Sequence, residues 1–164
     1  MAQPATGDRV AYSGTRDLRV IAGPTAAEHH HNWGKREAYV RIVDSESGSE
    51  VLKRPSPPLT TLWLTADGQY LVGLSNIKVG NQVQLFIISR DGRFVHEEQI
   101  CCADQRLQKS LCSESISNYV RWYNADDPSI ELFKTNNRPT SLAFNAFCGS
   151  SDSCPASRVE FPLR

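Results

Sequence analysis

Residues 59–100 read LTTLWLTADGQYLVGLSNIKVGNQVQLFIISRDGRFVHEEQI. The stretch predicts four short strands in succession, of which the inner ones are apolar and the last is more polar. Asp67-Gly68 and Asp91-Gly92 supply the positive φ that tight hairpin turns need. Four antiparallel strands with this gradient are typical of one β-propeller blade. The stretch therefore indicates an all-β protein.

Weaker strand patterns lie on both sides of this blade. Before it, we expect strands at 17–22, 37–44 and 50–53, with a polar loop at 25–36. After it, the apolar and polar residues alternate as in strands over segments 115–124, 130–135, 140–147 and 158–164, while 103–113 fits a short helix or an irregular loop.

A partial repeat supports the propeller-like interpretation. YVRIVDSESGSEVL (39–52) resembles QLFIISRDGRFV (84–95), at a spacing in the propeller range. A chain of 164 residues holds about three such units, whereas closed propellers typically need four or more. We therefore expect an incomplete, propeller-like stack of small antiparallel sheets. It would form a single domain over 17–164, after a mobile N-terminal segment at 1–16.

Composition excludes two classes of partner. The chain carries 18 basic and 18 acidic residues, so it lacks the basic surplus with which nucleic-acid binders contact phosphates. No apolar run approaches the roughly 20 residues that cross a bilayer. Hydrophobic residues make up 40% of the chain, which is enough for a globular core.

The cysteines and the N-terminus indicate an exported protein. Cys148 and Cys154 flank a small polar loop that suits a local disulfide, and Cys112 could close a second loop with Cys101 or Cys102. A bond between the adjacent cysteines would strain the backbone, so the fifth thiol stays free or pairs between chains. Met1 precedes AQPATG, as in a mature periplasmic protein whose signal peptide is absent from this sequence; a cytosolic start with a short disordered lead is the alternative.

No pattern indicates a metal site, a cofactor or a catalytic centre. Consecutive residues His29–His31 cannot all reach one ion in an extended chain, so a polar surface loop is favoured there. The cysteines lack zinc spacing, and the acidic residues at 44–50 favour a hairpin turn over a calcium loop. His96 stands apart from other histidines on the outer strand and no GxSxG elbow is present, so we predict a protein that is not an enzyme.

One loop of the blade is a candidate binding site. It joins two central strands, is longer than a hairpin needs and has Ile77 and Val79 as exposed-looking apolar residues, although both could instead tuck onto the sheet. Its residues are Ser75, Asn76, Ile77, Lys78, Val79, Gly80, Asn81 and Gln82. Tyr119, Arg121 and Tyr123 form a second candidate surface, because Tyr and Arg often anchor interfaces. The alternative, that this face is buried under the next sheet, is slightly favoured.

The segment WLTADGQYLVGLSNIKVGNQVQLFIISRDGRFVHEEQI (63–100) resembles the central part of the periplasmic immunity proteins that protect bacteria against type VI secretion peptidoglycan amidases. The likeness lies in the strand before Asp67-Gly68, the strands around the 75–82 loop and the ending VHEEQI. It implies a propeller-like fold and a loop that enters the amidase cleft. Carried over, that loop is 75–82, with Ser75, Asn76 or Asn81 hydrogen-bonding a catalytic histidine. The loop is not rich in serine and glycine, and neither the histidine-rich stretch nor 115–124 has a counterpart.

The leading hypothesis is thus an exported inhibitor that needs no cofactor and occludes a secreted peptidoglycan hydrolase. The alternative is an exported module that binds cell-wall glycan or an envelope protein, with Trp33, Tyr119 and Tyr123 as an aromatic platform.

Overall fold

In the computed structural model, the residues that the structure describes are 6–7, 15–32, 34–35, 37–77, 81–100, 113–114, 120–147 and 158–163. They contain no helix. Their strands are β1 (Thr6–Gly7), β2 (Thr15–Ala22), β3 (Thr25–Asn32), β4 (Glu37–Asp44), β5 (Glu50–Pro55), β6 (Thr61–Leu64), β7 (Tyr70–Leu74), β8 (Leu85–Ser89), β9 (Val95–Glu98), β10 (Ser113–Glu114), β11 (Val120–Arg121), β12 (Glu131–Thr135), β13 (Arg138–Asn145) and β14 (Arg158–Pro162).

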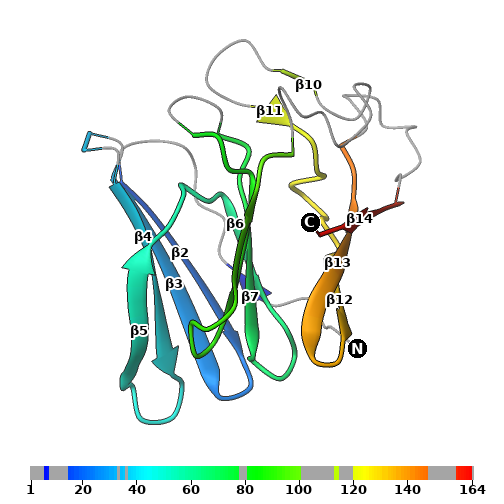
Figure 1. The fold of residues 1–164 in the computed structure, drawn as a ribbon. Coiled ribbons are helices and arrows are strands. Elements are labelled where there is room, and N and C mark those ends of the chain that lie inside the picture. The colour runs from blue at the N-terminus through cyan, green and yellow to red at the C-terminus, as the bar shows by residue number, and fades with distance from the viewer. Residues whose placement is uncertain are drawn as a thin grey trace.

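The strands form three antiparallel sheets and one small pair. The first sheet has the order β1-β2-β3-β4-β5, the central sheet β6-β7-β8-β9 and the third sheet β12-β13-β14, while β10 pairs with β11. Figure 1 shows the three sheets side by side, with the central sheet between the other two. They do not close into a barrel. The all-β, propeller-like stack predicted from the sequence is confirmed.

The two inner strands of the central sheet, β7 and β8, are buried on both faces. Successive side chains of a strand point to opposite faces. Leu71 and Phe86 therefore belong to a first core, shared with the first sheet, while Val72 and Ile87 belong to a second core, shared with the third sheet. Every residue of β7 and β8 is buried as a result, and these two strands read as continuous apolar runs.

Each core joins side chains from two sheets. The first core contains Leu18, Val20, Ala27, Val40, Ile42, Leu59, Leu62, Leu64, Leu71, Phe86 and Ile88. The second core contains Trp63, Tyr70, Val72, Leu74, Leu85, Ile87, Ile100, Trp122, Tyr123, Ile130, Leu132, Leu142, Phe144, Ala146 and Phe161.

The polar loop predicted at 25–36 is wrong over most of its length. Thr25–Asn32 forms β3, an inner strand that pairs with both β2 and β4. Gly23 (φ 55°) and Pro24 form a two-residue turn that folds β3 back along β2. The polar residue types of this segment suggested a loop. Histidine rings can nevertheless be buried as other rings are, so the segment can form an inner strand.

Other predicted elements agree with the structure to different degrees. The strands at 17–22, 37–44 and 50–53 correspond to β2, β4 and β5, and those at 130–135, 140–147 and 158–164 to β12, β13 and β14. Of the strand predicted at 115–124, the structure describes 120–124, where only β11 is formed. From the segment 1–16, Thr6–Gly7 pairs with Ile21 and Val20 of β2; 1–5 and 8–14 lie outside the described residues, as do 101–112.

Within the described residues, no helix has the length and apolar character needed to cross a membrane.

Candidate functional site

The 75–82 loop leaves β7 at Leu74 and returns to β8 at Leu85. Its base continues the strand pairing, because the Ser75 N–H donates to the Gln84 carbonyl (2.8 Å) and the Gln84 N–H donates to the Glu98 carbonyl (3.0 Å). The base of the loop is therefore paired through backbone hydrogen bonds at one end of the central sheet.

Asn81 holds the loop together from inside. Its Nδ2 donates to the Val83 carbonyl (2.7 Å), the Ile77 carbonyl (3.1 Å) and the Ser75 Oγ (3.3 Å), and its Oδ1 accepts the Val83 N–H (3.1 Å). One side chain thus bonds to both arms of the loop. Asn81 and Ser75 use these groups within the chain, so neither is positioned as the ligand for a catalytic histidine that the resemblance implied.

Of the two alternatives for Ile77, the structure has the one in which the side chain packs inside the molecule. Ile77 and Ser75 are completely buried. The Ser75 carbonyl accepts the indole N–H of Trp122 (2.7 Å), and the Trp122 ring packs edge-on against Phe144 with its centroid 5.1 Å away. This support could not be predicted from the local sequence, because Trp122 comes from a segment that is distant along the chain.

Among the described residues of the loop, Asn76 and Gln82 are polar and not fully buried. Gln82 is exposed and Asn76 is half-buried, with its N–H donating to the Thr60 Oγ1 (3.1 Å). Lys78, Val79 and Gly80 lie outside the described residues.

The second candidate surface loses one of its members. Tyr123 is 3% exposed, and its hydroxyl forms hydrogen bonds with the hydroxyls of Thr60 (2.8 Å) and Thr61 (2.9 Å). Tyr123, which bridges to Ala146 just after β13, therefore ties this segment to the central sheet and cannot belong to an aromatic platform for glycan. Trp33 and Tyr119 lie outside the described residues, as does the side chain of Arg121.

The three histidines divide between the two faces of β3. His29 and His31 are buried, with ring centroids 6.4 Å apart, and the His29 Nε2 accepts the Leu59 N–H (3.1 Å). His30 lies on the opposite face, between Asp17 (2.7 Å) and Glu28 (3.3 Å). The predicted surface loop is thus replaced by a strand. Among the described residues, no three His, Cys, Asp or Glu side chains are grouped to hold a metal ion.

His96 forms a pair with a carboxylate. Its Nε2 lies 2.5 Å from the Glu98 Oε1, both side chains are largely buried, and the Phe94 ring stacks near the imidazole. A histidine held by a carboxylate can serve as a base, but the contacts described for this one are the carboxylate and an aromatic ring. The disulfide candidates Cys101, Cys102, Cys112, Cys148 and Cys154 lie outside the described residues.

A pocket missed by the sequence analysis lies at the other end of the central sheet. It has a volume of about 340 Å³ and lies between the β8–β9 turn and the β12–β13 hairpin. Its lining residues are Gln69, Tyr70, Ser89, Arg90, Asp91, Arg93, Phe94, Asn137 and Arg138. The arginines come from segments separated by more than 40 positions, so only the fold brings them together. A more open groove of about 680 Å³ runs along β4 and β5, beside Tyr39 and Lys53.

Comparison with protein-family models, with curated proteins and with solved structures found no match.

Proposed function

We propose that this chain is an exported, periplasmic inhibitor that binds a secreted peptidoglycan hydrolase and blocks its active site with the 75–82 loop. The observation that carries the proposal is the internal bracing of this loop by Asn81 and its support by Trp122. The resemblance of residues 63–100 to amidase immunity proteins supplies the class of target.

Bracing matters because association costs conformational entropy. A loop that must be ordered on binding loses roughly 0.5–1.5 kcal/mol for each immobilised side chain that is rich in rotamers. In this loop, the Asn81 side chain has already fixed the carbonyls of Ile77 and Val83 before any partner arrives. A loop whose two arms are bonded to each other in advance, and which stands on a paired sheet, is suited to entering a cleft.

The structure changes which residues are proposed as contacts. Ile77 and Ser75 support the loop from below, whereas the exposed Gln82 offers its amide group to a partner. Asn76, Lys78, Val79 and Gly80 remain proposed contacts on the ground of their place in the sequence.

The test must leave the support intact. Replacing all of 76–81 with a flexible linker would remove the buried Ile77 and the bracing Asn81, and large-to-small changes at buried Ile cost about 2–5 kcal/mol. A sharper variant combines Lys78→Gly, Val79→Ser and Gln82→Ala. Its matched control is Ile77→Ala, which removes support and leaves the proposed contacts in place.

The hydrolase is obtained by capture on the purified protein from envelope and secreted fractions, and inhibition is measured as protection of peptidoglycan sacculi from digestion. We expect the triple variant to keep the wild-type melting temperature and lose inhibition at least about tenfold, which corresponds to 1.4 kcal/mol of binding. The Ile77→Ala control should mainly lower the melting temperature. Full inhibition by the triple variant would refute the loop assignment, and capture of sacculi without a hydrolase would refute the inhibitor function in favour of glycan binding.

A further inference from the structure

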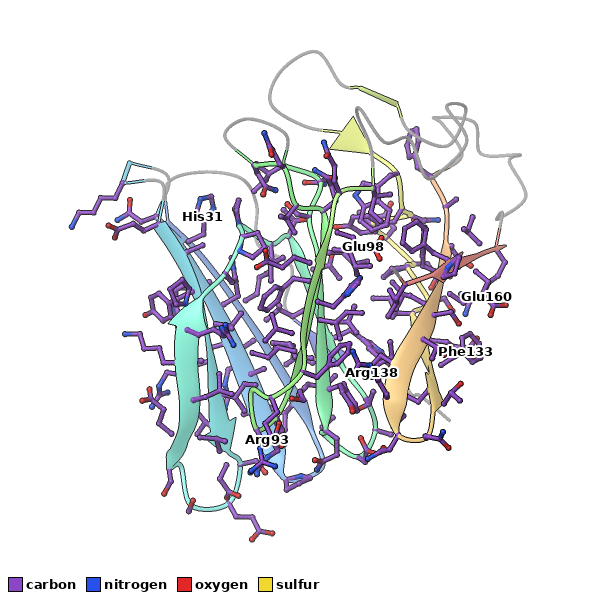
Figure 2. All side chains as sticks on the ribbon, viewed as in Figure 1. His31, Arg93, Glu98, Phe133, Arg138 and Glu160 are labelled. Atoms are coloured by element: carbon purple, nitrogen blue, oxygen red, sulfur yellow. The ribbon has the colours of Figure 1, made fainter. Side chains whose placement is uncertain are left out.

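The pocket between the central and third sheets carries an excess of positive charge. Three arginines line it (Arg90, Arg93 and Arg138), against one carboxylate, Asp91. The chain as a whole has no net charge, so this local surplus comes from the fold. Figure 2 shows Arg93 at the end of the β8–β9 hairpin, and Arg138 between the central sheet and the β12–β13 hairpin.

The charged groups of the pocket differ in how many hydrogen bonds and ion pairs they already make within the protein. Arg90 bonds to Asp44 (3.1 Å) and to the Thr25 hydroxyl (2.8 Å), so its role is to link sheets. The Asp91 Oδ1 accepts the Ser89 hydroxyl (2.7 Å) and the Arg93 N–H (3.0 Å).

The guanidinium groups of Arg93 and Arg138 keep most of their donors for a ligand. The Arg93 side chain is 90% exposed and reaches Asp91 only at 3.9 Å. Within the described part of the chain, Arg138 has no carboxylate partner, and its guanidinium carbon lies 5.4 Å from the centre of the Phe94 ring.

The backbone of the exposed Arg138 is held in place by its surroundings. Arg138 is the first residue of β13, directly after Asn136 and Asn137, whose φ values of 52° and 62° form the tight turn of the hairpin. The Asn137 carbonyl accepts the hydroxyl of Tyr70 (2.7 Å), which ties this turn to the central sheet. The Tyr70 ring meets Phe94 edge-on at 6.1 Å, so an aromatic wall stands beside the arginine.

We propose that this pocket binds a carboxylate group that is attached to an apolar body of about amino-acid size. The planar guanidinium forks of Arg138 and Arg93 match a carboxylate in a bidentate manner, and the Phe94 and Tyr70 rings give the apolar body a surface to pack on. A volume of about 340 Å³ lies at the small end of the range for ligand pockets.

This site is separate from the 75–82 loop. The loop follows Leu74, whereas the pocket contains Tyr70 and Ser89, at the opposite ends of β7 and β8. Five residues of strand span roughly 16 Å. Loss of the pocket should therefore leave inhibition by the loop unchanged, and the two proposals fail independently.

The probe is N-acetylphenylalanine, which joins a carboxylate to a ring, titrated into the ¹⁵N-labelled full chain and followed by amide chemical shifts. N-acetylphenylalaninamide is the matched neutral probe, and inorganic phosphate tests for a plain anion site. The variants are Arg138→Gln and Arg138→Lys. Arg19→Gln is the control for charge, because Arg19 is an exposed arginine of the first sheet.

We expect saturable shifts at Phe94, Asn137 and Arg138 with the carboxylate probe and none with the amide. Removal of a charge-assisted hydrogen bond weakens binding by about tenfold or more, so Arg138→Gln should lose at least that much. Arg138→Lys should lose most of the same binding affinity, because lysine lacks the planar guanidinium fork. Arg19→Gln should bind the probe as tightly as the wild type does. Equal binding by wild type and Arg138→Gln, shifts located elsewhere, binding of phosphate alone, or no binding at millimolar probe would each overturn the proposal.

Discussion

At the scale of the residue, one glycine decides how closely the first and central sheets approach. Gly68 lies in the β6–β7 turn with φ 73°, where an added Cβ would stand 2.7 Å from the Ala22 carbonyl oxygen and 2.7 Å from the Thr25 Oγ1. Gly48, in the β4–β5 turn, has nearly the same φ of 74° and no atom within 4 Å of an added Cβ. A side chain at Gly48 would meet backbone strain alone, whereas one at Gly68 would meet the same strain and a steric clash.

Alanine at these two glycines should therefore cost different amounts. Gly48→Ala should destabilise the protein by about 1–2 kcal/mol, the cost of left-handed backbone for an L-residue. Gly68→Ala adds a clash with backbone and should lose a further 1–3 kcal/mol or so, as overpacked sites do. Urea unfolding of both variants measures the difference. Equal losses would show that the turn yields without disturbing the first sheet.

Single residues were the hardest feature to predict from the sequence. The turn glycines Gly68 and Gly92 were placed correctly, because an Asp-Gly pair between apolar runs has a local cause. His29 is buried where a surface loop is predicted, and for Ile77 and Tyr123 the sequence leaves exposure and burial open. Burial at all three positions depends on segments that are remote along the chain. The arginine pocket was missed for the same reason.

At the scale of the element, the two hairpin turns of the central sheet are built alike. Residues 65–70 and 89–94 share the pattern Ser/Thr-x-Asp-Gly-x-aromatic. In each turn, the first hydroxyl donates to the carboxylate (2.6 and 2.7 Å) and accepts the N–H of the aromatic residue (3.1 and 3.0 Å). Asp67 and Asp91 each accept the N–H two residues further on, at 3.0 Å. This pattern is local, so the sequence predicted both turns.

These bonds make the turns sensitive to acid. The Ser89 hydroxyl and then the Arg93 N–H hold the pKa of Asp91 below its ordinary value of 3.8. Burial raises the pKa of Asp67, but the bonds it accepts outweigh that effect, and its pKa is also lowered.

A carboxylate with a lowered pKa stabilises the fold above its unfolded pKa, and this stability is lost as the pH falls through the folded pKa. We therefore expect the urea concentration at the unfolding midpoint to decrease once the pH drops below about 4. The double variant Asp67→Asn with Asp91→Asn should show a shallower fall. Asp127→Asn, an exposed acid outside these turns, serves as the control and should follow the wild type. A double variant as acid-sensitive as the wild type would contradict this origin.

At the scale of the whole molecule, the central sheet belongs to two cores at once. Its loss would expose apolar surface on both neighbouring sheets, so the three sheets should unfold together. The fold class was predictable because strands buried on both faces and turns with Asp-Gly leave a strong pattern. The row of three sheets follows from the length of the chain and the repeat.

Truncating either core tests this coupling. Ile42→Ala in the first core and Phe144→Ala in the second should each cost about 2–5 kcal/mol. Each should shift one transition, seen alike by the fluorescence of Trp33, Trp63 and Trp122 and by far-ultraviolet circular dichroism. Fluorescence that moves apart from the circular dichroism in the Ile42→Ala variant would show that the sheets melt separately.

The outer face of the first sheet, at one side of the stack, carries charged side chains. Arg41 lies between Glu50 (2.8 Å) and Glu28 (3.5 Å), and His30 stacks on Tyr39 with the centroids 4.9 Å apart. Covering these charges with another sheet would require their dehydration, which costs several kcal/mol for each ion. A face with these charges is therefore poorly suited to packing against a further sheet, like the polar outer face of a capping repeat in a solenoid. To engineer a fourth blade onto this side, one would first have to rewrite that face in apolar residues.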